Sequence, residues 1–91
     1  MQNNILSEKD TKVVLDILVE QIGLREEQIT LDARIIDDLG ADSLTVIEIT
    51  LALEERFSLS IPDEKLESVS TVRDLFELLA ELLGGSALQA A

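Results

Sequence analysis

The sequence of 91 residues contains no cysteine and no histidine. Without cysteine, the chain has no disulfide, no thiolate metal site and no thiol nucleophile of its own. Without histidine, it lacks the commonest general base and the commonest neutral metal ligand. A Ser-His-Asp catalyst therefore cannot form within the chain, and we expect no catalytic residues and no resident metal site.

Aromatic residues are also scarce, since the chain has no Trp or Tyr and only 2% aromatic residues, against 46% hydrophobic residues overall. Such a core has to be aliphatic, which favours packed helices over aromatic-rich strands. No apolar run approaches the roughly 20 residues that span a bilayer. The polar start over residues 1–4 is not typical of a signal peptide. We therefore expect one small cytoplasmic domain.

Basic residues are few. The chain has 7 Lys and Arg against 19 Asp and Glu, which gives a net charge of −12. A chain this acidic is repelled by nucleic-acid phosphates and by anionic membrane surfaces. We expect neither nucleic acid nor membrane as a partner. The expected molecule is a monomer.

Start signals and apolar periodicity predict four helices. The first begins after Ser7, where Asp10 completes a pattern similar to a capping box, and stops at Gly23. The others are predicted over about 43–57, 64–67 and 71–83, and the last begins at Thr71, with Asp74 three residues later. The predicted fold is all-α, a small four-helix bundle with a long first loop over 24–42 and a short third helix. We interpret this loop as packed down onto the bundle by its apolar side chains, which are Leu24, Ile29, Leu31, Ile35, Ile36 and Leu39. We expect a single domain over 1–91, with its core in 7–83 and flexible tails at 1–6 and 84–91.

The second helix has two apolar faces. With steps of about 100° per residue from Ser43, one apolar group falls between about 240° and 320° and a second between about 40° and 100°. The first group is Val46, Ile49, Leu53 and Phe57; the second is Leu44, Ile47 and Leu51, mixed with Glu48, Glu54 and Glu55. A thin bundle readily buries one stripe but rarely two. We interpret the first group as core and the second as a partner-binding surface with a charged rim. The alternative is that the long loop covers the second group.

The segment 37–44, with the sequence DDLGADSL, is the most informative part of the chain. Gly40 permits a tight turn, and Asp42 is a good N-cap candidate for the helix that follows. Ser43 then lies where the positive end of the helix dipole favours an anion. Ser43 has an ordinary alternative as a plain helix-start residue. The acidic cluster lacks the alternating spacing of a calcium loop, so we expect at most weak, non-specific divalent binding.

This segment, with Glu48 and the run ALEERF over 52–57, resembles the acyl carrier proteins of type II fatty acid and polyketide synthesis. Similar family segments fall at 20–24, 61–63 and 71–72, and the resemblance extends over roughly 7–83. The tripeptide DSL alone is a weak signal. The seven-residue run 38–44 placed before an acidic amphipathic helix is a strong one.

The resemblance implies a four-helix bundle whose Ser43 is modified rather than catalytic. A phosphopantetheinyl transferase, using magnesium and coenzyme A, attaches 4′-phosphopantetheine to that hydroxyl between Asp42 and Leu44. The arm ends in a thiol that holds acyl groups as thioesters, which supplies the chemistry that a chain without cysteine lacks. The implied partners are this transferase and acyl-processing enzymes with basic docking patches. The residues expected to meet them are Asp42, Leu44, Ile47, Glu48, Leu51, Glu54, Glu55 and Ile61.

Three features depart from the common fatty-acid pattern: Thr45, Arg56 and the tail at 84–88. They favour a specialised carrier in a polyketide, lipid or other dedicated pathway. Two other hypotheses stay open. One is an aminoacyl or peptidyl carrier of a nonribosomal pathway, although such carriers are usually less acidic. The other is an unmodified acidic adaptor that binds a basic partner through the second helix.

Overall fold

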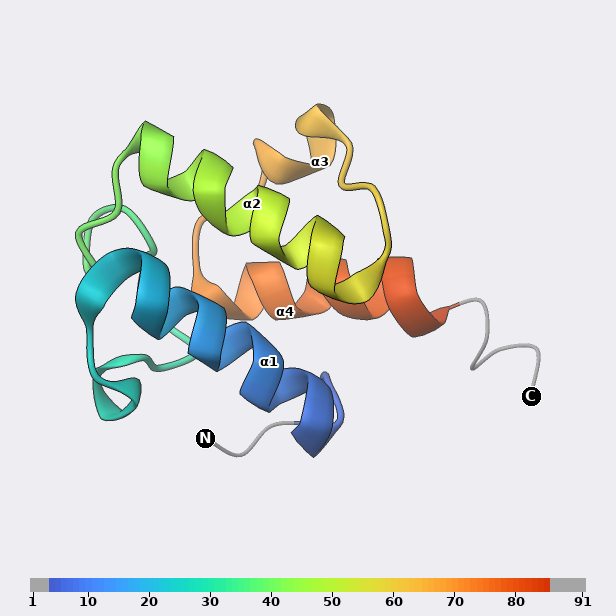
Figure 1. Ribbon diagram of the computed structural model, residues 1–91, viewed down its shortest axis with the longest axis horizontal. Helices are drawn as coiled ribbons and strands as arrows, with labels where there is room; N and C mark the ends of the chain where they lie inside the picture. The colour runs from blue at the N-terminus through green and yellow to red at the C-terminus, as the bar shows by residue number, and fades with distance from the viewer. Residues whose placement is uncertain (1–3, 86–91) are drawn as a thin grey trace.

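The structure is a computed structural model that describes residues 4–85, and it confirms an all-α bundle with a short third helix (Figure 1). The helices are α1 (Glu8–Leu18), α2 (Ser43–Phe57), α3 (Asp63–Leu66) and α4 (Val72–Ala80). A π-helical turn extends α1 over Val19–Gly23, another extends α4 over Glu81–Gly85, and a 3₁₀ turn lies at Glu26–Gln28. Of the predicted tails, residues 1–3 and 86–91 lie outside the described residues, whereas Gly84 and Gly85, which we assigned to the C-terminal tail, belong to the π-helical turn. Ile5 and Leu6, which we assigned to the N-terminal tail, are half-buried against the core.

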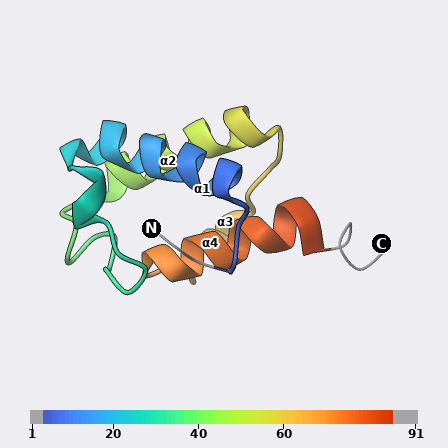
Figure 2. The same cartoon turned by 90° about the horizontal axis from the view of Figure 1, so that it is seen from below.

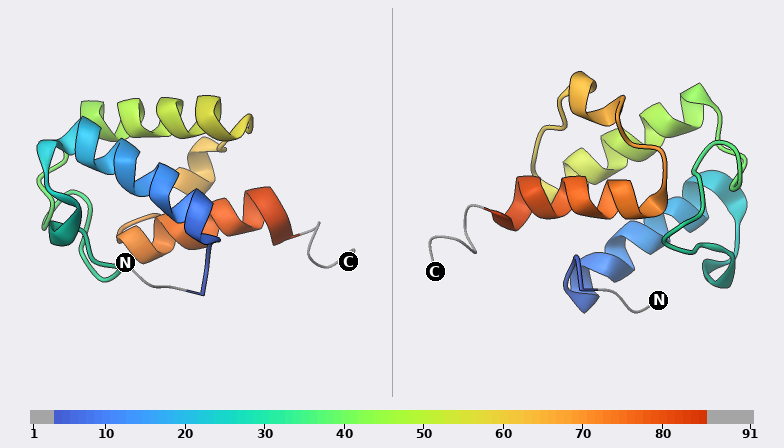
Figure 3. Two further views of the ribbon diagram at one scale, coloured as in Figure 1. Left: turned by 60° about the horizontal axis from the view of Figure 1, so that its bottom comes forward. Right: turned by 180° about the vertical axis from the view of Figure 1, so that it is seen from behind.

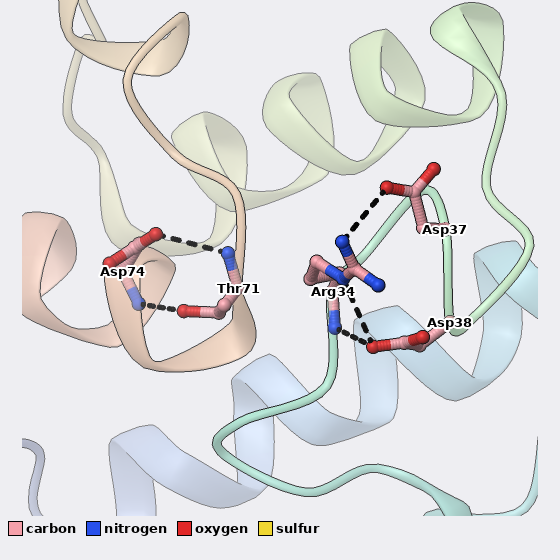
Figure 4. A network of polar contacts seen from close by, with 5 residues as sticks. All are labelled: Arg34, Asp37, Asp38, Thr71 and Asp74. Carbon is pink, nitrogen blue, oxygen red and sulfur yellow. Dashed lines mark hydrogen bonds and ion pairs between the residues drawn. The ribbon is translucent and has the colours of Figure 1, made fainter.

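Local side-chain caps set where the helices begin. The Ser7 hydroxyl accepts a hydrogen bond from the Asp10 N–H at 3.1 Å, which gives α1 its N-cap. At α4, Thr71 and Asp74 form a complete capping box. The Asp74 carboxylate accepts from the N–H groups of both Ser70 and Thr71, at 3.0 Å each, and these bonds lower the pKa of Asp74 (Figure 4).

The helices meet around an aliphatic core. The helices α1 and α2 contact each other, and Figure 2 shows α4 running beneath both of them. Figure 1 shows α3 beside the C-terminal half of α2. The most deeply buried large side chains are Phe76, Leu18, Leu53, Leu75, Leu79, Val14 and Val72. They come from α1, α2 and α4, so these three helices enclose the core. Of the predicted core face of α2, Ile49 and Leu53 are buried, whereas Val46 and Phe57 are half-buried at its margins.

The long connection from α1 to α2 is packed down onto the bundle, as its apolar residues predict. Ile29, Ile35, Leu39 and Ala41 are buried. Backbone hydrogen bonds tie the loop to the start of α4: the Val72 N–H donates to Ala33 O at 3.0 Å, and the Ile35 N–H donates to Ser70 O at 2.9 Å. The two views of Figure 3, of which the right one is from behind, show this loop crossing the end of the bundle beside the start of α4. An ion pair between Arg73 and Asp32, at 2.9 Å, adds a side-chain link.

Ile36 is an exception within that loop, because 55% of its surface is exposed. We expected the loop's apolar residues to pack inward together. The chain turns outward here in a tight segment closed by hydrogen bonds from the Asp38 and Leu39 N–H groups to Arg34 O, at 2.8 and 3.0 Å. Ile35 therefore points into the core and its neighbour Ile36 lies on the surface.

Candidate functional site

Asp42 and Ser43 start α2 at the place predicted for them. The Asp42 carboxylate accepts a hydrogen bond from the Thr45 N–H at 2.8 Å, and this bond lowers the pKa of Asp42. Ser43 is the first helical residue and is exposed, as are its neighbours Asp42 and Leu44. The Ser43 hydroxyl is thus accessible at the N-terminus of a 15-residue helix.

The turn before α2 holds this serine in place. Gly40 has a φ of 82°, a left-handed conformation that favours glycine. On either side of it, Leu39 and Ala41 are buried and anchor the turn in the core. The chain therefore leaves the core at Ala41 and presents Ser43 to solvent from a fixed position.

Asp37 and Asp38, which precede this turn, both form ion pairs with the side chain of Arg34. The Asp38 carboxylate accepts from the Arg34 N–H at 2.8 Å, which lowers the pKa of Asp38, and it lies 3.5 Å from Arg34 Nε (Figure 4). The Arg34 guanidinium also lies 3.6 Å from Asp37. Over residues 4–85, no three Asp or Glu side chains are placed to hold a metal ion together.

The second apolar face of α2 is uncovered. Leu44, Ile47 and Leu51 are 64%, 52% and 59% exposed, so the long loop does not bury them. Glu48 and Glu55 are exposed among them. Sequence reasoning missed Ile36, which lines the same cavity as Ile47 and Ser43 and adds apolar surface beside this face.

Two residues of the expected partner-binding set have other positions. Ile61 is only 5% exposed, so its side chain belongs to the core and cannot form part of a docking surface in this conformation. Glu54 is half-buried, and its carboxylate accepts a hydrogen bond from the Ile61 N–H at 2.7 Å. Glu54 therefore fixes the turn after α2 where the chain heads toward α3.

A cavity of about 610 Å³ opens beside Ser43, between α2, the long loop and the segment that joins α3 to α4. Such a volume lies in the range typical of small-ligand sites. Its walls are mainly aliphatic, from Ile35, Ile36, Val46, Ile47, Ile49, Leu66, Val69 and Leu75. The residues that α2 contributes include Ser43, Val46, Ile47 and Thr50, which recur at helical spacing in the sequence. The segments on the opposite side of the cavity could not be predicted from the sequence.

A smaller groove of about 210 Å³ lies on the other side of α2, against the end of α1. Leu51, Glu55 and Arg56 line it together with Glu20 and Gln21. Leu51 thus forms the border between the exposed face of α2 and this groove.

Within the stretch that the structure describes, every helix is too short or too polar to cross a bilayer.

The all-α bundle, with an exposed serine at the start of α2 beside an apolar cavity, agrees with the class of carrier proteins that the sequence resembles. Residues 12–84 match the family model described as a phosphopantetheine attachment site, and the chain belongs to this family. The family model describes the site at which phosphopantetheine is attached, so the cofactor predicted from the resemblance is confirmed.

Curated relatives agree with the family match. The chain is 52% identical to an acyl carrier protein of Syntrophobacter fumaroxidans over 68 residues, which cover 75% of this chain and 84% of the relative. It is 48% identical to an acyl carrier protein of Bdellovibrio bacteriovorus over 66 residues, 72% of this chain and 85% of the relative. An acyl carrier protein of Akkermansia muciniphila is 38% identical over 84 residues, 92% of this chain and 100% of the relative.

Proposed function

We propose that this chain is a non-enzymatic acyl carrier whose 4′-phosphopantetheine arm is attached at Ser43. The observation that carries the proposal is the position of Ser43, an exposed hydroxyl at the start of α2 that also lines the mouth of an apolar cavity. Family membership and the names of the relatives support the carrier role. The pathway is one of fatty acid, polyketide or related lipid synthesis.

The residues around Ser43 suit such an arm. In the transfer, Ser43 Oγ would lose its proton and attack the phosphorus that bears pantetheine in coenzyme A; the pyrophosphate bond would break and adenosine 3′,5′-bisphosphate would leave. The arm would then be held as a phosphodiester at the N-terminus of α2, where the helix dipole favours negative charge. Asp42 keeps the helix start in place through its bond to the Thr45 N–H. The arm supplies a thiol for thioester chemistry, which the chain cannot supply because it has no cysteine.

The cavity offers a place for an apolar cargo. An acyl chain that folds back from Ser43 meets Val46 and Ile47 first, both of which line the cavity. Burial of apolar surface there is favourable by about 25 cal/mol per Å². The bundle thereby shields the carried chain from water between enzymes.

The exposed face of α2 is the docking surface in this proposal. Leu44, Ile47 and Leu51 form its apolar centre, Ile36 extends it, and Asp42, Glu48 and Glu55 form its acidic rim. Partners with basic patches, namely a phosphopantetheinyl transferase and acyl-processing enzymes, complement this rim and the net charge of −12. Glu54 lies at the edge of the surface and Ile61 is left out of it.

The test is an intact-mass measurement after incubation with coenzyme A, magnesium and a broad-specificity phosphopantetheinyl transferase. We expect one phosphopantetheine increment on the wild type and on Ser60→Ala, a control at another exposed serine, and none on Ser43→Ala. Circular dichroism should show the same helix content in all three proteins. An increment on folded Ser43→Ala would move the site to another serine. No increment on the wild type would favour the unmodified adaptor.

A further inference from the structure

Thr50 places a hydroxyl on an otherwise apolar stretch of the cavity wall. It shares the α2 wall with Val46, Ile47 and Ile49, and it is half-buried. Thr50 follows Ser43 by seven residues, which is two helical turns or about 10 Å along the axis. A chain that enters the cavity beside Ser43 and runs along α2 therefore reaches Thr50 after the aliphatic contacts.

The hydrogen bonding of Thr50 determines what it can offer to a ligand. Thr50 Oγ1 donates to Val46 O at 2.8 Å, a bond within its own helix. A hydroxyl has a single hydrogen, so the lone pairs that remain on Oγ1 can only accept. Thr50 thus offers the cavity an acceptor, fixed in orientation by its own bond to the backbone.

This acceptor distinguishes between kinds of acyl chain. A chain made only of methylene groups removes water from Oγ1 without replacing its hydrogen bond, which is unfavourable. A keto group brings a second acceptor and does not pair with it. A hydroxyl group on the chain brings a donor and pairs with Oγ1 directly.

We propose that Thr50 is a specificity-determining residue that favours cargo chains bearing a hydroxyl group over saturated chains of the same length. The inference rests on the carrier function proposed above, with the arm on Ser43. It deepens that function by naming a class of cargo, the hydroxyacyl chains, and the atom that recognises it.

The test compares thermal midpoints of defined loaded forms. A broad-specificity transferase loads the chain from coenzyme A, octanoyl-coenzyme A, and its β-hydroxy and ω-hydroxy counterparts, and intact mass verifies each product. Failure to load any form would concern the attachment at Ser43 and not Thr50. In the wild type, we expect at least one hydroxyoctanoyl form to melt about 4 °C above the octanoyl form, the shift that one net hydrogen bond gives a domain of this size.

Two variants assign that difference to the hydroxyl of Thr50. Thr50→Val replaces the hydroxyl by a methyl group of similar size, and we expect it to abolish the hydroxyoctanoyl advantage. Thr50→Ser keeps the hydroxyl and should retain the advantage. The midpoint of each unloaded variant serves as its baseline, which separates cargo recognition from a general effect on folding.

Three results would overturn the proposal. The first is a wild type that melts at the same temperature with octanoyl and with both hydroxyoctanoyl chains. The second is an advantage that persists in Thr50→Val. The third is an equal loss in Thr50→Val for every loaded form, including the arm without cargo, since Thr50 would then contact the arm.

Discussion

The two faces of α2 carry similar residues and have opposite surroundings. Leu51 and Leu53 are separated by one residue, yet Leu51 is 59% exposed and Leu53 is fully buried at 0%. Leu53 packs in the core with side chains of α1 and α4, whereas Leu51 borders a surface groove beside Glu55 and Arg56. Aliphatic residues on one face of α2 therefore stabilise the fold, whereas in our proposal those on the other face bind partner proteins.

Truncation of the same side chain on each face should give the largest difference. Leu53→Ala leaves a cavity in the core and should lower the free energy of unfolding by about 2–5 kcal/mol. Leu51→Ala removes an exposed side chain and should change it by no more than about 0.5 kcal/mol. Urea unfolding followed by circular dichroism measures both values. An equal loss of unfolding free energy in the two variants would show that Leu51 contributes to the core as Leu53 does.

A charge reversal on the exposed face should affect encounter with a partner rather than folding. Glu48→Lys places a positive charge within the acidic rim, so modification by a basic transferase should slow by about tenfold at low salt. The effect should shrink as salt screens the charges. The measurement is the second-order rate constant for phosphopantetheine transfer at several salt concentrations.

Glu77→Lys is the matched control, because Glu77 is an exposed residue of α4 and the variant has the same net charge. Similar slowing in both variants would attribute the effect to net charge alone and would remove Glu48 from the docking surface.

A smaller effect on stability should follow from substitution of Asp74, whose carboxylate caps the start of α4. Its pKa is lowered mainly by the Thr71 and Ser70 N–H groups, so its contribution to stability is present above the unfolded pKa of about 3.9 and is lost as the pH falls through the lower folded value. Asp74→Asn should therefore be less stable than the wild type at neutral pH. The two proteins should converge once the pH lies below the lowered folded pKa of Asp74.

Urea unfolding of both proteins across this pH range checks the convergence. A stability difference that stays constant down to the lowest pH would mean that the substitution acts through packing and not through the charge of Asp74.

The sequence was sufficient where a signal is local. The bounds of α2, its N-cap at Asp42 and the capping box of Thr71 and Asp74 follow from residues within four positions of one another, and the structure has all of them. The exposed group of Leu44, Ile47 and Leu51 also followed from helical spacing, once a thin bundle was assumed to bury a single stripe.

The sequence was insufficient where the environment comes from distant segments. Ile36 and Ile61 are both apolar residues outside the long helices, yet Ile36 is exposed and Ile61 is buried. The loop that carries Ile36 is held to α4 by contacts such as the pair of Asp32 and Arg73, 41 residues apart, whereas the Ile61 N–H is bound by the Glu54 carboxylate of α2. The cavity beside Ser43 was not visible for the same reason, since three separate segments enclose it.

The docking role of the exposed α2 face is tested most directly by the rate at which a transferase modifies Leu51→Ala. The measurement is the second-order rate constant for phosphopantetheine transfer to Ser43, with the folded fraction of each protein known from its unfolding curve. We predict a rate at least about fivefold below the wild type, as for loss of an apolar interface anchor, with stability almost unchanged. A wild-type rate for fully folded Leu51→Ala would contradict the docking surface proposed here.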